Sequence, residues 1–164
     1  MNSARLIDRD PDAILNCLYL HQNALNLVTE MGLGLKMLPE NPIVWSDGDP
    51  IIQSWILLKT MVDDRIIPSL MQLLNTFDLN NGIQDDNINV LKTNVLKNQL
   101  RSLTPEVTRL SKLLQLDRQF WQAARQSDRI LQRQQQFMQH LTQLAQLLEA
   151  IVHHLNVHHL NSDD

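Results

Sequence analysis

The chain has 164 residues, of which 43% are apolar and 20% charged; this composition fits one folded domain and excludes a charge-rich disordered chain. Its four glycines and its many Leu and Gln residues favour helix over strand, because unbranched side chains lose little rotamer freedom in a helix. The single cysteine, Cys17, excludes an intramolecular disulfide, and a net charge of −4 argues against a dedicated nucleic-acid-binding domain.

The first predicted helix spans residues 11–31. Asp10-Pro11 is typical of a helix start, because Asp caps the first turn and proline is tolerated there. Apolar positions then recur at spacings of three and four, which predicts one buried face; they are Ile14, Leu18, His21, Leu25 and Val28. Gly32 and Gly34 predict the end of this helix, and the proline-rich segment 39–50 predicts a loop.

The second predicted helix spans residues 50–76, starting at the Asp49-Pro50 pair. Pro68 lies inside it and removes one backbone hydrogen bond, so we expect a kink or a short break at residues 65–67. Residues 78–86, which include Gly82 and two Asn, predict a loop.

A third helix is predicted over residues 86–102, with four apolar side chains facing inward: Leu91, Val95, Leu96 and Leu100. Thr104-Pro105-Glu106 then predicts a new helix start. The final segment, 105–158, contains neither Pro nor Gly and is either one helix of about 80 Å or two helices separated near Ser127.

A heptad pattern runs through this last segment. Its stronger half contains Ile130, Phe137, Leu141, Leu144, Leu148, Ile151 and Leu155. Its weaker half continues the same alternating spacings of three and four toward the N-terminus and contains Leu113, Leu116, Phe120, Ala123 and Ser127. An unbroken helix would extend beyond the shorter helices, so a second copy of the chain would have to cover it. We therefore favour an all-α bundle of four to five helices, a single domain over residues 1–164, that forms a homodimer through a long, straight or bent C-terminal helix.

Charge is distributed unevenly along the chain. Residues 1–91 carry five basic and twelve acidic side chains, whereas residues 92–133 carry nine basic and three acidic ones. The basic segment contains Arg118, Arg125 and Arg129, which we expect to form an outward stripe with an exposed Trp121. Such a stripe is a candidate surface for a protein partner or for a nucleic-acid backbone. The alternative is that it neutralises the acidic first half.

Histidines and carboxylates offer weaker signals. His154 and His158 stand four residues apart and could reach one metal ion, but exposed histidines near a helix C-terminus are the simpler interpretation. Cys17 and His21 have the same spacing, and we interpret them as buried core residues rather than as a nucleophile and base. The glycines match no phosphate-binding loop, so we expect no cofactor.

These features favour a non-enzymatic protein-interaction module, of the adaptor, chaperone or inhibitor type. The alternatives are a nucleic-acid-associated regulator and a ligand- or metal-sensing bundle. The N-terminal residues lack the apolar stretch of a signal peptide, and no apolar run is long enough to span a membrane. We therefore expect a soluble, cytoplasmic protein.

Overall fold

The computed structural model describes residues 11–36, 46, 48–80 and 88–160, and every regular element in this part of the chain is helical. In chain order the elements are α1 (Pro11–Lys36), α2 (Pro50–Met61), the π-helical turn η3 (Val62–Ile66), α3 (Ile67–Asn80), α4 (Ile88–Ala123) and α5 (Ser127–Leu160). The predicted loops at residues 39–50 and 78–86, and the Asp10 cap, fall largely outside the described residues.

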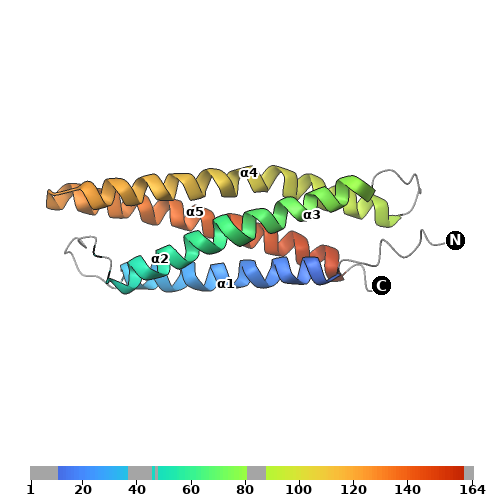
Figure 1. Ribbon diagram of the computed structural model, residues 1–164, viewed down its shortest axis with the longest axis horizontal. Coiled ribbons are helices and arrows are strands. Elements are labelled where there is room, and N and C mark those ends of the chain that lie inside the picture. Colours follow the sequence, from blue (N-terminus) through green and yellow to red (C-terminus); the bar gives the residue numbers. More distant parts are fainter. Residues whose placement is uncertain (1–10, 37–45, 47, 81–87, 161–164) are drawn as a thin grey trace.

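The helices form one elongated bundle (Figure 1). α2, η3 and α3 follow one another as a single irregular rod that crosses the front of the molecule diagonally, while α4 and α5 form an antiparallel hairpin. α5 packs against both α4 and α1, α1 packs against α2, and α3 packs against α4. The prediction of an all-α bundle is therefore confirmed. Within the described residues, no helix combines the length and apolar character needed to cross a membrane.

The start of α2 shows the predicted cap. The Asp49 carboxylate accepts a hydrogen bond of 2.8 Å from the backbone N–H of Ile51, and Pro50 occupies the first turn. This side chain satisfies an N–H that has no partner within the helix, and proline there has no N–H to lose.

Pro68 is accommodated without a break. The backbone N–H of Ile67 bonds to the carbonyl of Val62, five residues earlier, which defines the π-helical turn η3 immediately before the proline. A wider turn is a usual way for a helix to absorb a missing hydrogen bond. The irregularity lies where the sequence predicts it, but the helix continues past its predicted end at residue 76 to Asn80, so residues 78–80, which were predicted to lie in a loop, are helical.

Two further predicted helix boundaries are wrong. α1 continues past Gly32 to Lys36, because glycine inside a helix costs only about 1 kcal/mol and does not terminate it. α4 runs unbroken through Pro105, where the sequence predicts a new start. Leu100 and Val107, on either side of this proline, are fully buried in the core. Their packing holds both halves of α4 on one axis despite the lost hydrogen bond.

Replacing Pro105 with alanine should therefore raise the free energy of unfolding by about 2 kcal/mol, because the helix regains a backbone hydrogen bond and loses a steric clash. The matched control is Pro50→Ala, which alters a proline in the first turn of α2 and should change stability by less than about 1 kcal/mol. Urea unfolding followed by circular dichroism measures both. Equal effects at the two sites would contradict this account of α4.

The C-terminal segment is divided into two helices, one of the two predicted alternatives. α4 ends at Ala123 and α5 begins at Ser127. The heptad residues of α5 are buried within the single chain: Ile130, Phe137, Leu141, Leu144, Leu148, Ile151 and Leu155. Because the chain folds back on itself, the long overhang that motivated a homodimer is not formed.

The inward face of α4 also differs from the prediction. Leu96 and Leu100 are buried as expected, but Leu91 and Val95 are exposed. The buried face of α4 continues from Leu100 through Val107, Leu110, Leu114 and Trp121.

Candidate functional site

The turn between α4 and α5 sets the geometry of the most distinctive surface. The backbone N–H of Ala124 bonds to the carbonyls of Phe120 (3.1 Å) and Trp121 (3.2 Å), which closes the last turn of α4. The Arg125 guanidinium donates to the carbonyls of Gln122 (3.0 Å) and Ala124 (3.4 Å). A cation at a helix C-terminus is favourable, because the last carbonyls carry partial negative charge. Arg125 thus serves first as a cap.

The structure exchanges the predicted positions of Phe120 and Trp121. Trp121 is only 1% exposed, and its ring centroid lies 5.6 Å from that of Phe137, whereas Phe120 is 51% exposed. The prediction that Trp121 forms part of an exposed stripe is therefore wrong. That prediction assumed that the heptad pattern of α5 continues without interruption into α4. The turn at residues 124–126 separates the two helices, so the pattern of α5 does not identify the buried face of α4.

We define the hairpin face as two rows of side chains. Lys112, Leu116 and Phe120 follow one another on α4 at spacings of four, and Arg129 and Arg133 do so on α5. The Arg133 guanidinium lies over the Phe120 ring, 4.9 Å from its centroid, and this cation–π contact joins the two rows. Leu116 is 46% exposed, so the face combines an exposed aliphatic and an exposed aromatic side chain with three basic ones.

The predicted arginine stripe is divided between two helices. Arg118 belongs to α4, Arg125 lies in the turn at residues 124–126 and Arg129 belongs to α5, so no single helical stripe contains all three. Arg118 is partly buried, and Arg129 is exposed. Sequence reasoning found the basic hairpin but missed Arg133, whose contact with Phe120 is visible only once the two helices are paired.

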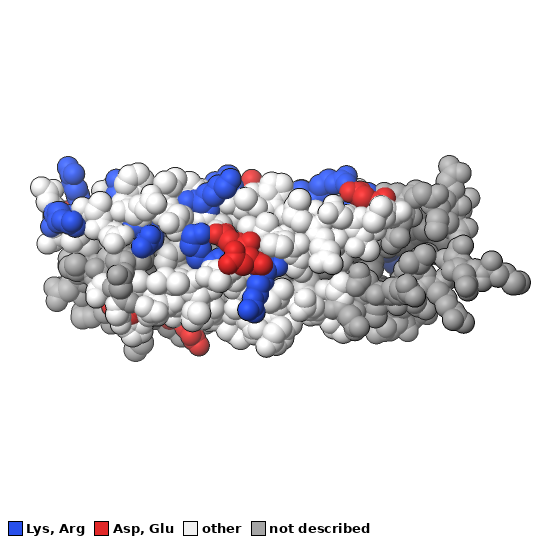
Figure 2. All heavy atoms as spheres, in the orientation of Figure 1, with Lys and Arg blue, Asp and Glu red and all other residues white. Residues whose placement is uncertain are grey.

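The positive charge on α4 and α5 divides into two groups. Near the start of α4, Lys97 and Arg101 form ion pairs with Asp78 of α3, at 2.5 and 2.9 Å. These pairs neutralise part of the acidic first half within the chain. At the hairpin, by contrast, no carboxylate of the described residues lies within ion-pair distance of Arg129 or Arg133. Figure 2 shows Lys and Arg side chains along α4 and at the hairpin end, and acidic ones near the middle of the same face.

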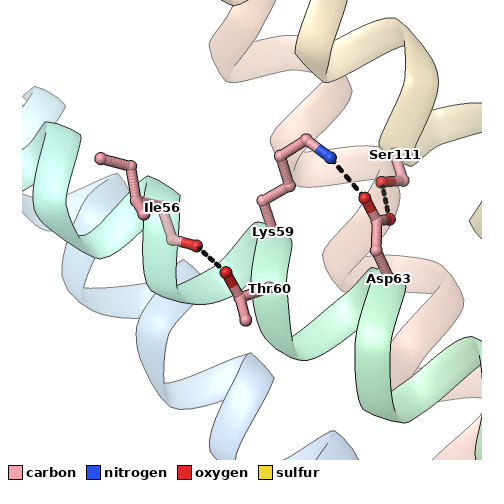
Figure 3. A network of polar contacts seen from close by, with 5 residues as sticks. All are labelled: Ile56, Lys59, Thr60, Asp63 and Ser111. Atoms are coloured by element: carbon pink, nitrogen blue, oxygen red, sulfur yellow. Dashed lines mark hydrogen bonds and ion pairs between the residues drawn. The ribbon is translucent and has the colours of Figure 1, made fainter.

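A second feature, which adjoins the hairpin face at Lys112 and Leu116, is an open groove of about 520 Å³ between α4 and the rod formed by α2, η3 and α3. In it, Asp63 accepts a hydrogen bond from the Ser111 hydroxyl (2.5 Å) through one oxygen and pairs with the Lys59 ammonium through the other (Figure 3). Both carboxylate oxygens are engaged. Asp63 therefore ties η3 to α4, and Lys59 and Ser111 take part in the same network.

A buried polar pair that the sequence did not indicate joins α4 to α5. The Asp117 carboxylate, in a residue only 3% exposed, lies 2.5 Å from Nδ1 of His140. The two residues are 23 positions apart, so no local spacing could have indicated the contact. His140 thereby supplies a polar partner for the Asp117 carboxylate, which lies on the inward face of α4.

Cys17 and His21 are core residues, as interpreted from the sequence. Both are fully buried, and Nδ1 of His21 donates a 2.7 Å hydrogen bond to the Cys17 carbonyl. Burial raises the pKa of the Cys17 thiol, and burial lowers the pKa of His21. Both shifts favour the neutral forms, which is the opposite of the thiolate and imidazolium of an activated pair.

The lowered pKa of His21 makes stability depend on pH. Between the folded-state pKa and the ordinary value of 6.5, the unfolded chain binds more protons than the folded one. Stability should therefore be fully present above pH 6.5 and fall as the pH drops below it, by at most about 1.4 kcal/mol per pH unit from this group. His21→Gln should reduce that slope in urea unfolding measured at several pH values; an unchanged slope would contradict the assignment.

His154 and His158, the candidate metal ligands, have different neighbours. His158 packs against Phe77, with ring centroids 6.5 Å apart, and its Nε2 lies 3.4 Å from the Thr93 hydroxyl. His154 lies instead beside His153, with centroids 5.7 Å apart, and partial burial lowers the pKa of His154. Among the residues that the structure describes, no three His, Cys, Asp or Glu side chains form a group able to hold a metal ion.

Comparisons with family models, with curated proteins and with solved structures found no match to this chain. The hairpin face must therefore be interpreted from its own chemistry.

Proposed function

We propose that this chain is a non-enzymatic, cytoplasmic protein-interaction module that binds a protein partner through the hairpin face. The observation that carries the proposal is the exposed Leu116–Phe120 pair bordered by Arg129 and Arg133. Aromatic and arginine side chains are enriched where proteins bind proteins, because each buries a large area and still makes directional contacts.

The polar clusters elsewhere have structural explanations. Asp63 ties η3 to α4, Asp117 and His140 join α4 to α5, and His21 bonds to its own helix. The hairpin face has no comparable role inside the bundle, because Leu116 and Phe120 remain 46% and 51% exposed even though Arg133 lies over one side of Phe120. Keeping such side chains exposed costs free energy, which binding a partner would recover.

The proposal can be tested by placing the photo-crosslinking residue p-benzoylphenylalanine at position 120 and expressing the full chain in its native host. A control chain carries it at Met71 of α3, which is 50% exposed and so matches Phe120. We expect a discrete protein adduct from position 120 that disappears when Arg133→Glu is added, and none from position 71. The same adducts from both positions would contradict the proposal, and a nucleic-acid adduct would favour a nucleic-acid-associated regulator instead.

A further inference from the structure

The dimensions of the hairpin face match those of a helix. Lys112 and Phe120 are eight residues apart on α4, or about 12 Å, which is slightly more than two helical turns. Arg129 and Arg133 are one turn apart on the neighbouring antiparallel helix. A third helix packed along this pair would meet Leu116 and Phe120 with apolar residues spaced three or four apart, as in other helix–helix contacts.

The charges on the face select an acidic partner. Arg129 is exposed and Arg133 is held in place, because its guanidinium lies over Phe120 and donates a 3.2 Å hydrogen bond to Gln136. A guanidinium fixed in this way can receive a carboxylate with little further loss of side-chain freedom. Of the two acidic residues between positions 112 and 133, Asp117 is buried, and Asp128 lies in the first turn of α5.

A protein helix fits this face better than a single-stranded nucleic acid does. Base stacking uses an open face of an aromatic ring, and Arg133 lies over one of the two faces of Phe120, which leaves a single face for a base. Its neighbour Leu116 offers an aliphatic surface, which packs well against leucine or isoleucine and contributes little to base stacking.

We infer that the hairpin face binds an acidic amphipathic α-helix of a partner protein, laid along α4 and α5, with its apolar residues on Leu116 and Phe120 and its carboxylates facing Arg129 and Arg133. This inference rests on the proposed function and adds the chemical class of the partner.

The experiment uses a phage library of random peptides of about 20 residues, long enough for five helical turns, selected on the immobilised full chain. The enriched sequences are then synthesised, and their affinities are measured by fluorescence anisotropy in low and high salt. Circular dichroism of each variant confirms that it is folded, which is expected because Phe120, Arg129 and Met71 lie on the surface.

The inference predicts that the enriched peptides carry Asp or Glu beside apolar residues at helical spacing. It also predicts that their binding weakens about tenfold or more with Phe120→Asp and with Arg129→Glu, and in high salt. Met71→Asp, the matched control, should leave binding unchanged.

Four results would overturn the inference. Enriched peptides that need Phe120 but are neither acidic nor helical would refute the partner class while leaving the protein-interaction role in place. Peptides that bind Phe120→Asp as well as the parent chain, or no enrichment at all, would refute both. Light scattering that shows a dimer converted to a monomer by Phe120→Asp would assign the face to a second copy of the chain.

Discussion

Replacing Phe137 with alanine is expected to lower the free energy of unfolding by about 3–5 kcal/mol. Phe137 is fully buried and packs edge-on against Trp55, with ring centroids 5.2 Å apart, and against Trp121 at 5.6 Å. It therefore joins α5 to both α2 and α4. Removing its ring would leave a cavity bordered by two rigid indoles, and rigid walls cannot collapse to refill it.

Urea unfolding measures this loss as a lower midpoint with an unchanged slope. Val157→Ala, a truncation at an exposed position of the same helix, is the control and should cost less than about 0.5 kcal/mol. If Phe137→Ala leaves too little folded protein to measure, Phe137→Leu should show a smaller loss of about 1–2 kcal/mol. A loss no larger than that of Val157→Ala would refute the described core.

Replacing His140 with alanine is expected to cost about 3 kcal/mol, because it leaves the buried Asp117 carboxylate without its partner. The double variant Asp117→Leu with His140→Leu should be much less destabilised, since it removes the polar group together with its partner. The non-additive term of the double-mutant cycle measures the coupling directly. Additive effects would show that the two side chains do not interact.

Local signals identified the helices well. The start of α2 needs only Asp49 and Pro50, and the irregularity before Pro68 follows from a missing N–H, so both could be predicted from neighbouring residues. Prediction from neighbouring residues failed where contacts between distant residues stabilise a different local structure. Pro105 predicts a helix start, but Leu100 and Val107 pack into the core on either side of it and keep α4 continuous.

The candidate site was only partly predictable for a related reason. Sequence analysis identified the basic segment, with Arg118, Arg125 and Arg129, but placed Trp121 outside and Phe120 inside. A shift of one residue rotates a helix by about 100°, so an error of one position in the heptad exchanges buried and exposed neighbours. The break at residues 124–126 introduced that error.

By itself, the sequence determined the helical class, the position of most helices and the uneven charge, because these depend on residue type and on spacings within a few turns. The tertiary structure alone decided that α5 folds back on α4, that Asp117 meets His140, and that Arg133 covers Phe120. Each of these contacts joins side chains on different helices. Their formation depends on how the apolar faces of the whole bundle pack together, and a pattern within one helix does not contain that information.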